Sequence, residues 1–145
     1  MNALEEIIDE YDAYDRDHPE YTKEDIIKFI LREINDDDHS NSIGEIQLLK
    51  VSYNNHLEKI LEIIDDNNYN EVARLIDFLV FSYQQELVHL EATMNPLNED
   101  YIEIYHDKES FFDKQLVFNK FIETKINMFR SVKTVEKKLK IWYYI

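Results

Sequence analysis

The sequence predicts an all-α fold, namely a single-domain antiparallel bundle of five to six helices. Apolar residues recur at helical spacing along most of the 145 residues. The polar segments between these stretches are short, which favours antiparallel packing of consecutive helices. The chain has one glycine, Gly44, whereas tight turns between strands usually need glycine at positive φ. The three observations together argue against a many-stranded fold.

Four helices are expected in the first two thirds of the chain, because the apolar spacing is regular there. We place them over residues 3–15, 22–35, 43–66 and 70–94. The first ends before Pro19, since a proline restricts the conformation of the residue that precedes it. Thr22 and Asp25 resemble a capping box at the start of the second helix. Phe78 and Phe81 make the middle of the fourth helix apolar on nearly all sides, which predicts that it is the central, most buried helix.

The last third of the chain has a less definite pattern. Residues 98–107 form a short segment in which the alternation of Ile102 and Ile104 fits a strand as well as a helix. Residues 110–140 show helical spacing and correspond to one long helix or two. The aromatic end, residues 141–145, fits either a helix end or a strand, so an alternative to the purely helical fold is a short strand pair between residues 101–106 and 141–145.

Charge is unevenly distributed along the chain. The sequence has 31 acidic and 16 basic residues, for a formal net charge of −15. Residues 114–145 contain only two of the acidic residues but eight of the basic ones. We therefore expect one acidic helical domain over residues 1–145 with a basic C-terminal helix at about 114–145. Because the field of the acidic body repels polyanions, we expect it not to bind nucleic acid directly.

Several classes of protein are disfavoured by what the sequence lacks. Without cysteine, it has no disulfide, no thiolate metal site and no cysteine nucleophile. A single glycine also excludes the Gly-rich phosphate-binding loops. The first residues are acidic with no apolar stretch after them, and no apolar run approaches the roughly 18 residues of a membrane span. These features predict a cytoplasmic protein that does not enter a membrane.

One pair of residues matches a metal-binding pattern. Glu86 and His89 have the Glu-x-x-His spacing that di-iron helical bundles use, which places a carboxylate and an imidazole on one helix face. That chemistry requires the pair twice together with two further glutamates, and a motif this short also occurs by chance on helix surfaces. We therefore predict that the protein holds no metal and no cofactor.

A second pair resembles a nuclease signature. Arg32 and His39 are separated by six residues, similar to the Arg-x(4–6)-His signature of HEPN ribonucleases. However, three aspartates at 36–38 precede His39, and such a neighbourhood repels phosphate. We interpret Arg32 instead as a cation in the last turn of a helix, where it interacts favourably with the helix dipole. The protein is accordingly predicted not to be an enzyme.

The acidic first helix is the most distinctive candidate site. Carboxylates three or four residues apart on a helix lie about 5–6 Å from one another, comparable to the spacing of phosphates along a nucleic acid. Such rows favour binding to a basic protein surface, as in an inhibitor, immunity protein, antitoxin or phage anti-host factor that blocks a nucleic-acid-handling partner. The predicted partner-binding residues are Glu5, Glu6, Asp9, Glu10, Asp12, Tyr14 and Asp15. The alternative is that the excess negative charge only keeps the protein soluble.

A second hypothesis concerns the basic C-terminal helix. Its lysines and arginines between residues 125 and 140 are expected to neutralise the acidic helices of their own bundle. A structural or regulatory module that forms a homodimer through this helix is the alternative function, with Phe129, Val132 and Lys133 as the candidate dimer contacts. Binding of this helix to nucleic acid or membrane ranks third, since the overall negative field opposes it.

Overall fold

The computed structural model describes residues 2–13, 21–36, 44–94 and 108–143, with side chains described for residues 2, 4–13, 21–36, 44, 46–91 and 115–133. These ranges contain five helices and no strand. The helices are α1 (Ala3–Ala13), α2 (Lys23–Ile34), α3 (Glu45–Ile63), α4 (Tyr69–Met94) and α6 (Lys108–Tyr143). The predicted all-α bundle is confirmed.

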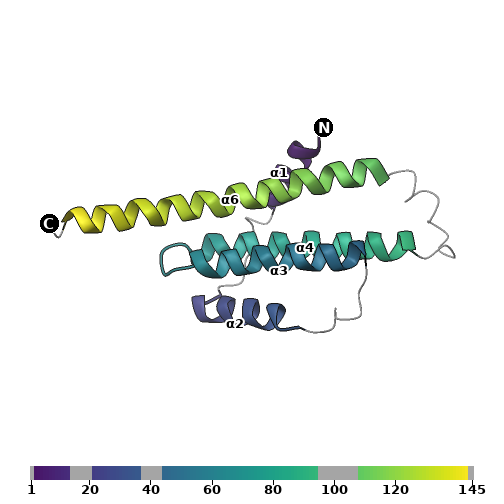
Figure 1. The fold of residues 1–145 in the computed structure, drawn as a ribbon. Helices are drawn as coiled ribbons and strands as arrows, with labels where there is room; N and C mark the ends of the chain where they lie inside the picture. The colour runs from purple at the N-terminus through teal and green to yellow at the C-terminus, as the bar shows by residue number, and fades with distance from the viewer. Residues whose placement is uncertain (1, 14–20, 37–43, 95–107, 144–145) are drawn as a thin grey trace.

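The helices pack around a central antiparallel pair. α3 and α4 lie side by side, with α2 along one flank and α6 along the other (Figure 1). The short α1 packs against both α6 and α4. The basic region forms one continuous helix, and the C-terminal end of α6 extends beyond the ends of α3 and α4 (Figure 1).

Short polar motifs define the helix ends. The capping box predicted at α2 is present: the Asp25 backbone N–H donates to Thr22 Oγ1 at 3.2 Å, and the Thr22 backbone N–H donates to Asp25 Oδ2 at 3.4 Å. Between α3 and α4, Asp65 and Asn68 each accept a backbone N–H of the other, at 2.8 and 2.9 Å. The Asn68 side chain also donates to the Ile63 carbonyl at 2.8 Å. Since these bonds satisfy groups that the helix ends leave open, they fix a tight reversal between the two central helices.

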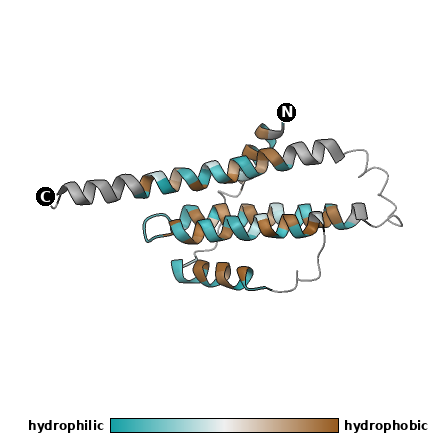
Figure 2. Ribbon diagram, viewed as in Figure 1, coloured by the Kyte–Doolittle hydropathy of each residue, from teal (hydrophilic) through white to brown (hydrophobic). Residues whose placement is uncertain are grey.

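The core is apolar on the facing sides of all five helices, as the hydropathy colouring of α2, α3 and α4 illustrates (Figure 2). Phe78 of α4 is completely buried. Its ring centroid lies 5.4 Å from that of Tyr11 of α1, 5.4 Å from that of Phe118 and 5.9 Å from that of Phe121, both of α6. The other buried apolar residues of α4 are Val72, Ala73, Leu75, Ile76, Leu79, Tyr83 and Leu90. α4 therefore contributes more buried apolar residues than any other described helix, as predicted. Phe81, on which the prediction also relied, is 36% exposed, so the middle of α4 is not buried on all sides.

The strand alternative is wrong where it can be examined. Residues 141–143 continue α6 as helix, because the helical spacing that precedes them does not break. Residues 101–106, the other half of the predicted pair, lie outside the described residues, as does the segment 98–107. Among the helices that the structure describes, none has the length and apolar composition needed to cross a membrane.

Polar side chains are also buried, between α3 and α4. Lys50 is only 5% exposed, and its ammonium lies 5.4 and 5.6 Å from the ring centroids of Tyr53 and Tyr83. The two rings stack at 4.1 Å with an interplanar angle of 12°. Cation–π attraction offsets part of the cost of desolvating the ammonium. Burial, reinforced by the Glu33 carboxylate, raises the pKa of Tyr83 to about 12, so this cluster contains neutral tyrosines at physiological pH.

Replacing the central aromatic residue should strongly destabilise the bundle. Phe78→Ala leaves a cavity between α1, α4 and α6, and we expect it to lower the free energy of unfolding by about 3–5 kcal/mol. Urea denaturation followed by circular dichroism measures the loss. Leu48→Ala is the control, because Leu48 is 70% exposed and should change stability by less than about 0.5 kcal/mol. Equal stability of the two variants would contradict the assigned core.

Buried His56 should make stability depend on pH. Burial lowers the pKa of His56 below its ordinary 6.5, with Lys59 acting in the same direction and Glu123 opposing. Between the two pKa values the unfolded chain binds more protons than the folded one, so stability falls as the pH drops from about 6.5 through the folded pKa. We expect urea denaturation at pH 7.5 and 5.0 to show that acidification lowers the free energy of unfolding less in His56→Gln than in the wild type. An identical decrease in both proteins would show that His56 does not cause the pH dependence of stability.

Candidate binding surface on helix α1 and the adjoining cavity

Two buried side chains hold α1 on the bundle. Ile7 and Tyr11 are both buried, and the Tyr11 ring makes edge contacts with Phe78 and Phe121 at centroid distances of 5.4 and 5.2 Å. At the start of the helix the Asn2 side chain accepts the Glu5 backbone N–H at 2.8 Å. This N-terminal cap and the buried side chains determine which face of α1 points outward.

Cations from two other helices surround the end of α1. The Arg74 guanidinium of α4 lies 4.1 Å from the Tyr11 ring centroid, donates to the Tyr11 carbonyl at 3.4 Å and pairs with the Asp12 carboxylate at 3.2 Å. Lys125 of α6 places its ammonium 5.0 Å from the same ring centroid. Positive charge near the last turn suits the helix dipole. Of the predicted partner-binding residues, Asp12 is thus engaged within the chain, although it remains exposed.

The outward face of α1 carries carboxylates together with apolar side chains. Glu5, Glu6 and Asp9 are exposed, as predicted for a surface row. Leu4 and Ile8 lie along the edge of the buried stripe, beside Glu5 and Asp9, and are 47% and 39% exposed. The apolar spacing of the first helix includes both residues, but among its described members Ile7 and Tyr11 alone are buried, because a helix this short contacts the bundle along a narrow stripe. We call the five exposed residues, Leu4, Glu5, Glu6, Ile8 and Asp9, the α1 face.

One described site residue departs from the predicted surface row. Glu10 is half-buried and lines a cavity, so the proposed Glu6–Glu10 row does not exist as two exposed neighbours. Tyr14 and Asp15 lie outside the described residues.

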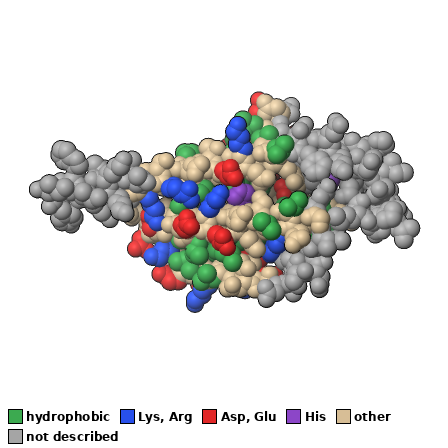
Figure 3. All heavy atoms as spheres, viewed as in Figure 1, with side chains coloured by type: hydrophobic (Ala, Val, Ile, Leu, Met, Phe, Trp, Pro, Cys, Tyr) green, Lys and Arg blue, Asp and Glu red, His purple; other side chains and the backbone are tan. Residues whose placement is uncertain are grey.

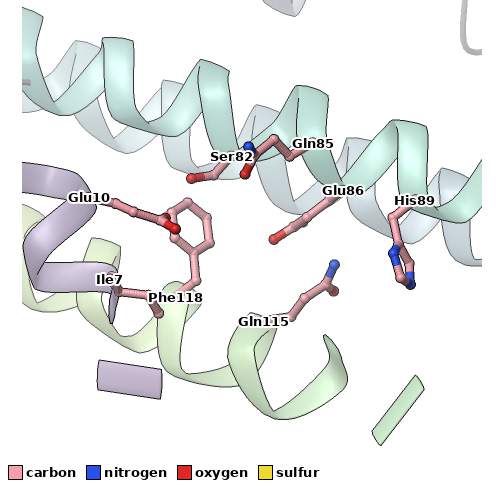
Figure 4. A pocket seen from close by; sticks show the side chains of 8 residues that line it. All are labelled: Ile7, Glu10, Ser82, Gln85, Glu86, His89, Gln115 and Phe118. Atoms are coloured by element: carbon pink, nitrogen blue, oxygen red, sulfur yellow. The ribbon is translucent and has the colours of Figure 1, made fainter. Parts of the chain in front are cut away.

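The cavity beside α1 has a volume of about 190 Å³ and lies between three helices (Figure 4). Glu10 and Ile7 enter from α1, and Gln115 and Phe118 from α6. The Glu10 and Glu86 carboxylates extend toward the same space, with Ser82 beside Glu10 (Figure 4). Gln115 Nε2 is buried and has no hydrogen-bond partner among the described residues. The full lining is Ile7, Glu10, Ser82, Gln85, Glu86, His89, Gln115 and Phe118.

Sequence reasoning identified only part of this cavity. Glu86 and His89 were recognised from their spacing on one helix face, and the cavity contains both. Ser82, Gln85 and Gln115 carry no local signal, because the cavity forms only when α4 and α6 meet. Within the part of the chain that the structure describes, no group of three or more histidines and carboxylates is arranged to hold a metal ion.

Only Arg32 of the predicted nuclease pair lies among the described residues. Arg32 lies in the last turn of α2, is exposed, and has its guanidinium 5.6 Å from the Phe29 ring centroid. This placement fits the interpretation of Arg32 as a helix-end cation. His39 lies outside the described residues.

The candidate dimer residues of α6 do not share one environment. Phe129 is half-buried and packs against the core. Lys133 donates to the Glu62 carbonyl at 3.3 Å, near the end of α3, and Arg130 lies 3.7 Å from the Glu62 carboxylate. Val132 is the outward-facing member, 56% exposed, with Met128 exposed to the same extent one turn earlier. On the visible face in Figure 3, Lys and Arg side chains stand among Asp and Glu side chains.

Comparison with known proteins yields no relative. No family model matches the chain, and no similar protein was found among curated proteins or among solved structures.

Proposed function

We propose that the protein is a non-enzymatic binding module that acts in the cytoplasm through the α1 face. Its partner carries a basic surface, as nucleic-acid-handling proteins do, and the module blocks that surface as an inhibitor, immunity protein, antitoxin or phage anti-host factor. The observation that supports this proposal is the exposure of Glu5, Glu6 and Asp9, together with that of Leu4 and Ile8, on a helix held by buried Tyr11.

The mixed composition of the α1 face supports a protein partner. Carboxylates attract a basic partner over long distances and fix its orientation, but exposed charge pairs contribute little net affinity. Burial of apolar surface supplies much of the favourable free energy of association. Leu4 and Ile8 are the groups on this face that can provide it. A partner of matching chemistry has basic residues around an apolar patch.

Charge reversal on the α1 face should abolish partner binding without unfolding the protein. We choose Glu5→Lys with Asp9→Lys, because both carboxylates are exposed, whereas Asp12 pairs with Arg74 and its replacement would disturb the helix anchor. We expect tagged wild type to retain a basic protein from its native host at low salt. The double variant should retain at least about tenfold less, a change of about 1.4 kcal/mol in binding free energy.

The matched control is Glu58→Lys with Glu91→Lys, which changes the net charge equally at exposed sites on α3 and α4. We expect it to retain the partner. Raising the salt concentration should release the partner from the wild type, because charges are screened beyond about 10 Å at 0.1 M salt. Equal retention by both double variants would show that the α1 face is not the binding site.

A homodimer formed through α6 is the second candidate, supported by the exposure of Met128 and Val132 one turn apart on its outer side. For this candidate we expect light scattering to give a salt-insensitive dimer. Met128→Asp with Val132→Asp should yield a folded monomer, because it adds charge to an apolar contact. Phe129 is unsuitable for this test since it packs against the core. A dimer that survives the double substitution would exclude this part of α6 as the contact.

A further inference from the structure

We propose that the cavity between α1, α4 and α6 receives an arginine side chain of the partner protein. This inference rests on the proposed function, since it names the partner group that enters next to the α1 face. The two sites adjoin because Glu10, which lines the cavity, lies one helical turn after Glu6 of the α1 face.

The charged groups of the cavity suit a guanidinium. Glu10 comes from α1 and Glu86 from α4, and both carboxylates extend into the same space (Figure 4). A guanidinium presents five N–H donors in a planar fork, so it can bond to carboxylates on two sides at once. A lysine ammonium is a compact point charge that is more strongly hydrated, and transferring it into the cavity costs more.

The apolar groups of the cavity suit the rest of the side chain. Ile7 and Phe118 are buried residues that form part of its lining. An aromatic ring is a favourable surface for a planar guanidinium. The methylene groups of arginine can pack against an aliphatic side chain while the charged end reaches polar groups. A site that offered only carboxylates would not distinguish arginine from other cations.

Gln115 adds a requirement for a hydrogen-bond acceptor. Its Nε2 is buried without a hydrogen-bond partner among the described residues, and leaving a buried donor unsatisfied is unfavourable. A guanidinium alone contains no acceptor. An arginine within a polypeptide also brings backbone carbonyl oxygens, so its guanidinium can enter the cavity and bond to the carboxylates while a carbonyl of the partner's backbone, beside the cavity, accepts from this amide.

The volume of the cavity indicates the size of its occupant. Ligand pockets for drug-sized molecules usually measure about 300–1,000 Å³, whereas this cavity measures about 190 Å³. It therefore fits a side chain better than a whole metabolite. A larger cavity of about 380 Å³ lies between α2 and α4, but the Asp25 carboxylate at its edge already serves the α2 capping box, and nothing there specifies an occupant.

The test uses N-acetyl-L-arginine methylamide as the probe, titrated into the full ¹⁵N-labelled chain and followed by NMR. We expect saturable shifts of the amides that line the cavity, and at least tenfold weaker binding of N-acetyl-L-lysine methylamide. Glu86→Gln should weaken binding of the arginine probe at least tenfold. Glu91→Gln, an exposed site on the same helix, should leave the affinity unchanged.

A second variant tests the contribution of the Gln115 amide separately from that of the carboxylates. Gln115→Leu should weaken binding of the arginine probe severalfold but leave methylguanidinium, which has no carbonyl, unaffected. This comparison also keeps the proposal testable if Glu86→Gln does not fold. Strong binding of methylguanidinium alone would identify a free guanidinium compound as the ligand and would overturn the assignment to a partner's arginine.

Other results would overturn the proposal outright. They are shifts spread over the α1 face that leave the cavity unchanged, equal affinity for the arginine and lysine probes, or full affinity in a folded Glu86→Gln protein. The outcome is separable from the proposed function. If Glu5→Lys with Asp9→Lys loses the partner while the arginine probe never binds, the cavity assignment fails and the binding face stands.

Discussion

The packing of Tyr11 against Phe78 is the contact on which the rest of the candidate site depends. An isolated helix of 11 residues is marginal in water, because nucleating a helix costs more than its few hydrogen bonds return. Tyr11 supplies tertiary contacts to Phe78 of α4 and Phe121 of α6, and Arg74 covers the Tyr11 ring. These contacts fix the rotation of α1. That rotation directs Glu5 and Asp9 outward and places Glu10 at the cavity.

The basic helix neutralises one part of the acidic body. Arg130 and Lys133 of α6 contact Glu62, at the end of α3, where a cation is also favoured by the helix dipole. Exposed pairs of this kind contribute at most about 1 kcal/mol each. These pairs therefore neutralise negative charge at one place but add little to the stability of the fold. That stability depends on the apolar core. The α1 face lies at a different place, and beside it Asp12 pairs with Arg74.

The period of the apolar residues was sufficient to predict the fold, because a bundle requires little beyond helix length, helix ends and one apolar stripe per helix. Thr22 and Asp25 even predicted a particular pair of hydrogen bonds, since a capping box is local in sequence. The rotation of each helix was less predictable. Leu4 and Ile8 have the spacing of core residues yet are exposed, and Lys50 looks like a surface lysine yet is buried between tyrosines. Both outcomes depend on how many neighbours a helix has, which local spacing does not contain.

The cavity was also not predictable from local sequence. It bears on how the protein could distinguish one partner from another. Its residues come from three helices, so no stretch of sequence resembles it. An acidic surface alone attracts basic proteins without distinguishing them, because long-range attraction depends on net charge more than on shape. Discrimination requires a difference in binding free energy between partners, which arises where groups are buried and an incorrect match leaves a donor or a charge unsatisfied. We propose a division of roles in which the α1 face provides attraction, while the adjoining cavity, with Glu10, Glu86 and the buried Gln115 amide, penalises a wrong side chain.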